Sequence, residues 1–288
     1  MHPIPKPWDN RPQFEHLPPK SQLPTMYDLP SEDPEEPGLP DEFHIYQPRL
    51  LSETFRPDPA LVKDYMTATD LNLYYDPANI LWYKRPDWFA VLGVAQAQEV
   101  EKLRWSYVIW QEEIAPYLLV ELLSPGTEKD DLGTRLRDVQ QPPAKWDVYE
   151  RYLRIPFYAV YSRHSAELKL FGLIAGRYHP IPLNAPAQGE WQGYWLAEAG
   201  IGLGLWDGVF EGVEGRWLRF YDATGAWIPS RDERLREQER RAEQAQARAE
   251  QESARAEQER TRAEQAQARA ERLAARLRAL GISSEEEG

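Results

Sequence analysis

Residues 117–162, YLLVELLSPGTEKDDLGTRLRDVQQPPAKWDVYERYLRIPFYAVYS, hold the pattern that decides the fold. The first seven residues, YLLVELL, are apolar except for Glu121, which is typical of a strand buried on both faces. After a polar loop, a proline pair precedes Trp146, Tyr149 and Leu153, whose spacings of three and four predict an amphipathic helix. The closing FYAVYS returns to a strand pattern. A strand, a helix and a strand in this order predict a mixed α/β domain.

Shorter apolar runs, separated by Pro, Asn and Gly turns, surround this centre and predict further strands. In contrast, ALVKDYM at residues 60–66 predicts a short helix. We therefore expect one α/β domain over residues 57–228, with a mixed central sheet flanked by helices. The further strands are expected within residues 71–76, 79–84, 87–94, 167–181, 202–213 and 216–222.

Residues 1–56 are rich in proline and acidic side chains and have no sustained period of two or of 3.6. This composition predicts an extended arm. Some of the arm is expected to pack on the domain, because it has more large apolar side chains than a free linker requires. These are Tyr27, Phe43, Tyr46, Leu50, Leu51 and Phe55.

Residues 229–280 predict a long helix, because Arg, Ala and Glu recur every seven residues from Arg241 to Arg276. One heptad column holds only Ala from position 242 to 270, and Leu273, Leu277 and Leu280 add large apolar side chains at the end. Two interpretations stay open: a solvated single helix with Glu and Arg pairs, or a weak coiled coil that joins chains into a homo-oligomer. The acidic residues 281–288 are expected to be disordered.

Composition excludes several classes of protein. The 288 residues contain no cysteine, which removes disulfides, thiolate metal sites and cysteine nucleophiles, and no apolar run has the length of a membrane span. With no secretion signal at the N-terminus, we expect a cytoplasmic protein that does not enter a membrane. Of 34 basic and 47 acidic residues, positions 228–288 hold 13 and 14, which leaves 21 basic and 33 acidic residues before them.

That net charge of −12 argues against tight nonspecific binding of nucleic acid, which requires basic side chains against the phosphates. An enzyme with acidic metal ligands and a local basic groove remains compatible with it. The candidates for such a groove are Arg135, Arg137, Arg151 and Arg154.

Several kinds of site have no support in the sequence. The glycine runs lack the spacing and the lysine of a phosphate-binding loop. His164 and His179 are isolated rather than paired at metal-ligand spacing. Ser124 lacks the glycines of a hydrolase nucleophile turn, and it is better explained as a turn residue at the end of a strand.

Two acids and one lysine remain as candidates for chemistry. Glu121 lies in an apolar strand, where an ionised carboxylate is costly without a cation or strong donors beside it. Asp87 begins another strand after a proline, and two carboxylates on neighbouring strands can hold Mg²⁺ or Mn²⁺. Lys145, on the following helix, is placed to orient water and to offset charge at a phosphate. The alternatives are a turn role for Asp87, an arginine partner for Glu121 and a solvated Lys145.

The stretch from residue 85 to 163 resembles the Uma-type family (Uma two) of the PD-(D/E)XK restriction-endonuclease-like superfamily. The shared pieces are RPDWFAV, LLVELLSPGTEKDDLGTRL and KWDVYERYLRIPFYAVYS, and the Glu, Arg, Ala and Gln tail is similar to that of cyanobacterial members. The resemblance implies a restriction-endonuclease-like core. It makes Asp87 the acid of the PD motif, Glu121 the second metal-binding acid and Lys145 a catalytic lysine that has moved from position 123 to the helix.

The chain departs from the family pattern in three places. Pro116 and Tyr117 stand where many relatives have Pro-Asp, so a third carboxylate is missing there. The usual Glu-Tyr-Trp after the helix is replaced by apolar residues 157–159, which affects packing more than chemistry. An insertion with two glutamines and two prolines, residues 140–143, precedes Lys145 and divides the helix.

Two functions are therefore weighed. The first is a metal-dependent endonuclease that hydrolyses DNA phosphodiester bonds through Asp87, Glu121 and Lys145. The alternative is a noncatalytic nuclease-fold protein that recruits partners through its long C-terminal helix, together with its aromatic-rich N-terminal arm. Retention of all three charged residues favours the endonuclease.

Overall fold

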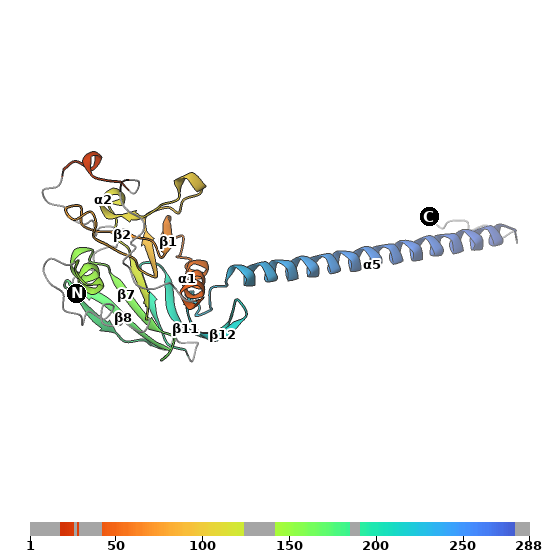
Figure 1. The fold of residues 1–288 in the computed structure, drawn as a ribbon. Helices are drawn as coiled ribbons and strands as arrows, with labels where there is room; N and C mark the ends of the chain where they lie inside the picture. Colours follow the sequence, from red (N-terminus) through yellow and green to blue (C-terminus); the bar gives the residue numbers. More distant parts are fainter. Residues whose placement is uncertain (1–17, 26–27, 29–41, 124–141, 185–190, 280–288) are drawn as a thin grey trace. The chain divides into compact units, whose positions relative to one another are not determined.

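A computed structural model contains two compact units, one before and one after the boundary between Ser230 and Arg231 (Figure 1). The first unit is a mixed α/β domain, and the second holds the long helix α5 (Arg231–Ala279). The α/β class and the long C-terminal helix are thus as the sequence predicts. The structure describes residues 18–25, 28, 42–123, 142–184 and 191–279.

The larger sheet has six strands in the order β1-β4-β6-β7-β8-β9. Only β6 and β7 pair in parallel among these neighbours; every other pair is antiparallel. Their connection contains α4 (Lys145–Asp147) and the π-helical turn η4 (Val148–Tyr152), which confirms the expected strand, helix and strand. The strands are β1 (Tyr65–Thr69), β4 (Trp88–Leu92), β6 (Leu118–Leu122), β7 (Phe157–Ser162), β8 (Glu167–Ile174) and β9 (Arg177–Ile181).

Two three-stranded sheets complete the β-structure of the described residues, in the orders β10-β11-β12 and β3-β2-β5. Every range in which the sequence predicts strands contains strand residues, although β11 begins one residue and β12 three residues before the predicted ranges. The remaining strands are β2 (Leu73–Tyr74), β3 (Tyr83–Lys84), β5 (Tyr107–Val108), β10 (Gly193–Leu196), β11 (Ile201–Phe210) and β12 (Val213–Tyr221). The remaining helices are α1 (Glu42–Thr54), α2 (Ile109–Glu112), η2 (Lys20–Gln22) and η3 (Val100–Lys102).

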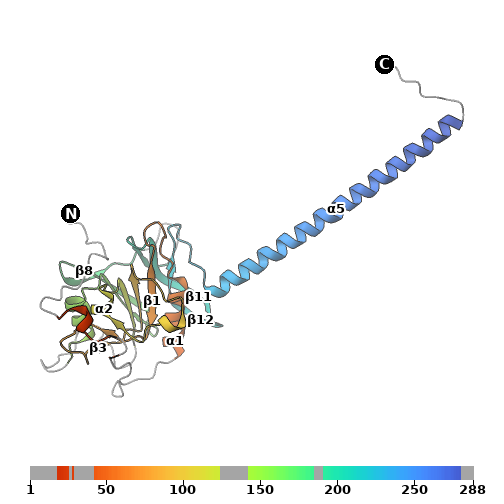
Figure 2. The same ribbon diagram turned by 90° about the horizontal axis from the view of Figure 1, so that it is seen from above.

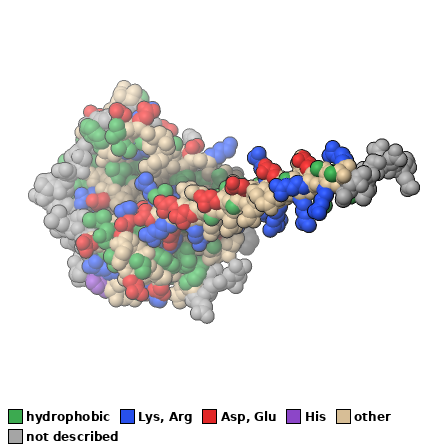
Figure 3. All heavy atoms as spheres, turned by 90° about the vertical axis from the view of Figure 1, so that its right-hand side faces the viewer, with side chains coloured by type: hydrophobic (Ala, Val, Ile, Leu, Met, Phe, Trp, Pro, Cys, Tyr) green, Lys and Arg blue, Asp and Glu red, His purple; other side chains and the backbone are tan. Residues whose placement is uncertain are grey.

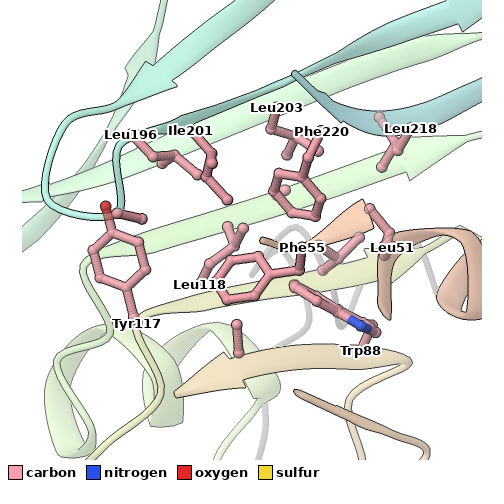
Figure 4. Close-up of a cluster of buried hydrophobic side chains, with 14 of the residues drawn as sticks. Leu51, Phe55, Trp88, Tyr117, Leu118, Leu196, Ile201, Leu203, Leu218 and Phe220 are labelled. Carbon is pink, nitrogen blue, oxygen red and sulfur yellow. The ribbon is translucent and has the colours of Figure 1, made fainter. Parts of the chain in front are cut away.

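Both faces of the six-stranded sheet are covered. On one face, Leu118 and Val120 pack against residues of β11 and β12, including Leu203 and Phe220 (Figure 4). On the other face, Leu119 and its neighbours pack against the helical segment that contains Val148. Because successive side chains of a strand point to opposite faces, β6 is buried at all five positions, as the apolar run predicts.

Helix α1 corrects one expectation. Residues 42–54, predicted to be extended, form a helix that lies beside β12 in both views of the ribbon (Figures 1 and 2). The Gln47 side chain donates to the Leu218 carbonyl and accepts from the Leu218 N–H, both at 2.9 Å. Burial of apolar side chains outweighs the proline at position 48. The expected packing is confirmed for Phe43, Tyr46, Leu50, Leu51 and Phe55, whereas Tyr27 lies outside the described residues.

The short helix expected at residues 60–66 is also wrong. The N–H groups of Leu61 and Val62 donate to the Asp58 carbonyl in a turn, and β1 begins at Tyr65. Met66 pairs with Val91 along the edge of the large sheet. Seven residues are too few for a helix to resist this pairing with β4.

Helix α5 is continuous over 49 residues, and none of them is buried. Side chains four residues apart pair along it, for example Arg255 with Glu259 and Arg260 with Glu264. Acidic and basic side chains are interspersed along the helix (Figure 3). In the part of the chain that the structure describes, no helix has both the length and the apolar character needed to cross a membrane.

Candidate active site

The pairing of β4 with β6 brings the two predicted acids together. The antiparallel register pairs Trp88 with Val120, and one further step sets Asp87 opposite Glu121. The Asp87 Oδ2 atom accepts a 2.6 Å hydrogen bond from the backbone N–H of Leu122, the residue after Glu121. The two carboxylates therefore lie at the same end of neighbouring strands.

Glu121 is completely buried, and both of its carboxylate oxygens have donors. The Lys145 ammonium donates to Oε2 at 3.0 Å, and the Tyr149 hydroxyl donates to Oε1 at 2.8 Å. A cation and a hydroxyl thus compensate the loss of water around this carboxylate. The sequence predicts a partner of this kind from the acid in the apolar strand.

The helical segment before β7 supplies both donors. Lys145 is the first residue of α4, and it follows an extended Ala144 after two prolines. Tyr149 lies four residues later, so the two side chains share one face. Val148 and Tyr149 are fully buried against the sheet, which fixes the segment, whereas 21% of the Lys145 side chain stays exposed. The inserted prolines do not separate Lys145 from Glu121.

The segment also contains a π-helical turn. The Leu153 N–H donates to the Val148 carbonyl at 2.9 Å, five residues back. Within the turn, Glu150 has donors other than those of Glu121: it accepts from Arg177 and from the Tyr178 N–H, each at 2.9 Å. Although burial opposes ionisation of Glu150, these donors lower its pKa below the ordinary value. The π-helical turn therefore contains both Tyr149, which donates to Glu121, and a second carboxylate, Glu150, which has its own donors.

His44 of α1 is a neighbour that the sequence does not predict. Its Nε2 lies 3.2 Å from the Leu122 carbonyl oxygen, and because that oxygen can only accept, Nε2 carries the proton in this contact. Asp87 and His44 thus bind the N–H and the carbonyl of one residue, Leu122, the last residue of β6. No pattern around His44 marks it, since its contact is 78 residues away in the chain.

Of the four arginines expected in a basic groove, Arg151 and Arg154 lie in the described part of the chain. Arg151 lies 3.4 Å from Asp147 and 3.5 Å from Glu150, so two acids offset its charge. It lines a cavity of about 400 Å³ together with Pro143, Asp147 and Tyr152. Arg154 has a left-handed backbone with φ of 52°. Arg135 and Arg137 lie outside the described residues, as does Ser124.

Among the described residues, no group of three or more His, Asp or Glu side chains could hold a metal ion. The acids at the site are thus Asp87 and Glu121, and Mg²⁺ commonly takes one or two protein carboxylates and completes its shell with water and phosphate oxygens. Two carboxylates are too few for a metal cage made by the protein alone.

Comparison with models of protein families identifies a match. A family model described as "Uma2: Putative restriction endonuclease" matches residues 11–193, more than half of the chain. The match includes α1, β4, β6 and α4, and therefore every residue of the site above. No curated protein matches the chain.

Proposed function

The chain belongs to the Uma2 family, and on this premise we propose that it is a metal-dependent endonuclease that hydrolyses DNA phosphodiester bonds at Asp87, Glu121 and Lys145. One observation carries the proposal. The completely buried Glu121 accepts hydrogen bonds from Lys145 and Tyr149, and Asp87, on the paired strand, accepts one from the N–H of the next residue, Leu122. Carboxylates that can hold a metal ion, with a cation close to them, suit the metal-assisted hydrolysis of a phosphodiester.

Mg²⁺ or Mn²⁺ is the proposed cofactor. Asp87 and Glu121 would hold it, because carboxylate oxygens are the preferred ligands of these hard cations. When bound, the cation supplies Lewis-acid polarisation of the phosphate and offsets its negative charge. A buried, ionised acid in an otherwise apolar strand stabilises the fold less well than an apolar residue of similar size would. Its presence at this position therefore favours a chemical role.

The protein residues then have distinct tasks. Tyr149 orients the Glu121 carboxylate through a 2.8 Å hydrogen bond, and Asp87 is fixed by the Leu122 N–H at 2.6 Å. Lys145, which keeps part of its side chain exposed, can reach a phosphate or an attacking water while it stays near Glu121. Fixed donors and acceptors of this kind stabilise charge that develops during hydrolysis.

The test is cleavage of supercoiled plasmid and of single-stranded DNA by the purified chain with Mg²⁺, with Mn²⁺ and with EDTA. Asp87→Asn, Glu121→Gln and Lys145→Met should each lower the rate by at least about 100-fold. Glu112→Gln and Lys102→Met are matched controls, because these residues form ion pairs outside the site with Arg104 and Glu99.

Circular dichroism and thermal unfolding establish that each variant is folded. Metal-dependent cleavage that survives Glu121→Gln would move the site elsewhere. A folded wild type without cleavage under any condition would refute the endonuclease and favour a noncatalytic protein that recruits partners.

A further inference from the structure

A row of acidic residues crosses three neighbouring strands at the end of the sheet that holds the candidate site. The register of β1 on β4, continued by one residue, sets Asp70 opposite Asp87. The Asp70 N–H donates to the Asp87 carbonyl at 3.3 Å, which supports this pairing. Glu121 follows on β6, on the other side of Asp87. Three acids therefore occupy corresponding positions at β1, β4 and β6.

A cation contacts each end of this row. Lys145 lies 3.0 Å from Glu121 at the β6 end, and the Arg85 Nε atom lies 2.8 Å from Asp70 Oδ1 at the β1 end. Among the described residues, no three His, Asp or Glu side chains are placed to hold a metal ion, so Asp70 is not a third metal ligand. Its partner is an arginine that precedes Asp87 by two residues.

Arg85 is oriented by Asp70 and yet accessible. The side chain of Arg85 is 25% exposed, and that of Asp70 is 48% exposed. Asp70 has a left-handed backbone with φ of 52°, a conformation that Asp tolerates better than most residues. A guanidinium has five N–H donors, so a contact with Asp70 is compatible with a second contact to an anion. Arg85 can therefore bind an anion beside Asp87.

The chemistry of the guanidinium indicates which anion this is. Its planar fork matches two oxygens of a phosphate group. The proposed hydrolysis brings a phosphodiester to Asp87 and Glu121. A phosphate group next to Arg85 would then belong to the same DNA strand.

The charge of the chain makes such a local contact necessary for DNA binding. Residues 1–227 carry 21 basic and 33 acidic side chains, so their net charge repels DNA. Affinity for phosphates must come from cations at the site. Arg151, which the sequence suggests for this task, lies close to Asp147 and Glu150. Arg85, in contrast, adjoins the acids of the candidate site.

We propose that Arg85 binds a phosphate group of the DNA strand that is cut at Asp87 and Glu121, and that Asp70 orients the guanidinium. The inference rests on the proposed function, because it gives the same substrate a further contact. An ion pair that served only the stability of the fold would depend equally on both partners. A phosphate contact requires Arg85 but not the Asp70 carboxylate, which repels DNA.

The experiment is fluorescence anisotropy of a dye-labelled DNA duplex titrated with the full chain in EDTA, at salt concentrations from about 50 to 200 mM. Without divalent metal, binding is measured separately from cleavage. Arg85→Gln should weaken binding about 10-fold at the lowest salt. It should also reduce the salt dependence, the slope of log K against log[salt], by about 0.9, the value for one phosphate contact. Asp70→Asn breaks the same ion pair but should neither weaken binding nor change the slope.

Lys63→Gln is the control for loss of a positive charge. Lys63 is exposed at the other end of β4, where the carbonyl of the next residue, Asp64, accepts from the Gly93 N–H. This substitution should leave affinity and slope unchanged. If Arg85→Gln does not fold, Arg85→Lys replaces it. Lysine keeps the charge but loses the fork, so the wild-type slope with weaker binding is expected.

Several results would overturn the proposal. They are a wild type that does not bind the duplex at the lowest salt, an unchanged slope for Arg85→Gln, equal losses for Arg85→Gln and Asp70→Asn, and wild-type affinity of Arg85→Lys where that variant is used. The expected changes in a chain that cleaves no DNA with any metal would refute the endonuclease and leave the phosphate contact intact. Metal-dependent cleavage by Arg85→Gln at wild-type rate and affinity would do the reverse.

Discussion

Lys145 and Glu121 are 24 residues apart in the chain, yet the Lys145 Nζ atom lies 3.0 Å from Glu121 Oε2 in a region where the carboxylate is completely buried. The strand supplies the acid and the helical segment after the prolines supplies the cation. The Glu121 charge would be costly at this place without the lysine, because a buried unpaired ion loses its hydration without compensation. The pair therefore couples the stability of the domain to the chemistry proposed for it.

The first prediction concerns this coupling. Lys145→Met leaves Glu121 with Tyr149 but without its cation, and we expect the free energy of unfolding to fall by about 3–5 kcal/mol. Adding Glu121→Gln should recover part of the loss, because the buried charge is then gone. Urea unfolding at pH 7 measures both. Lys102→Met is the matched control and should change stability by less than about 0.5 kcal/mol, since its ion pair is exposed. Strictly additive effects of the two substitutions would contradict the coupling.

The second prediction concerns His44. His44→Leu removes the donor to the Leu122 carbonyl, which should cost about 1–3 kcal/mol of unfolding free energy. His44→Gln keeps an N–H donor and should restore most of it. If hydrolysis depends on the Leu122 peptide position, cleavage by the two variants should follow the same order. A control is His179→Leu, because His179 is exposed on β9. Equal stability of the two His44 variants would mean that the hydrogen bond to the Leu122 carbonyl does not stabilise the fold.

The central part of the site could be predicted because its signals are local. An acid in an apolar strand requires a partner that compensates its charge. The helical segment after the two prolines has Lys145 and Tyr149 four residues apart, on one face. The strand buried on both faces could be predicted for the same reason. The chemical roles of Asp87, Glu121 and Lys145 stay predictions until cleavage is measured.

The rest of the structure depends on contacts that no local pattern encodes. Pro48 argues against a helix at residues 42–54, and the contacts of α1 with β12 that stabilise the helix join residues far apart in the sequence. The segment 60–66 has helix-like spacing, but pairing with β4 decides its conformation. His44 contacts Leu122, which is 78 residues away in the chain.

The third prediction is a pH dependence set by Glu150. Burial raises its pKa, but the Tyr178 N–H and Arg177 outweigh that and hold the pKa below its ordinary value of 4.5. The ionised carboxylate therefore stabilises the folded state above pH 4.5, and this contribution is lost as the pH falls through the lower folded pKa. Relative to Glu150→Gln, the wild type should gain about 1.5–3 kcal/mol at pH 7 and lose that advantage at low pH.

Chemical unfolding of both proteins between pH 7 and pH 3 provides the measurement. The exposed Glu101→Gln serves as the matched control, and its difference from wild type should stay small throughout. A Glu150 advantage that grew toward acid pH would mean that burial, rather than the donors, dominates this carboxyl.

The last prediction concerns α5 and homo-oligomers. Leu235, the alanines at every seventh position from 242 to 270, and Leu277 form one apolar column, but the column three residues further on contains Glu252 and Glu259. Large apolar side chains at both columns are what hold a coiled coil together. We therefore expect weak, concentration-dependent dimerisation, lost when Leu273 and Leu277, both about half exposed, are changed to Gln. Sedimentation equilibrium over a hundredfold range of concentration measures it, with Gln244→Ala as a control outside both columns. A monomer at every concentration would identify α5 as a solvated single helix supported by its own Arg and Glu pairs.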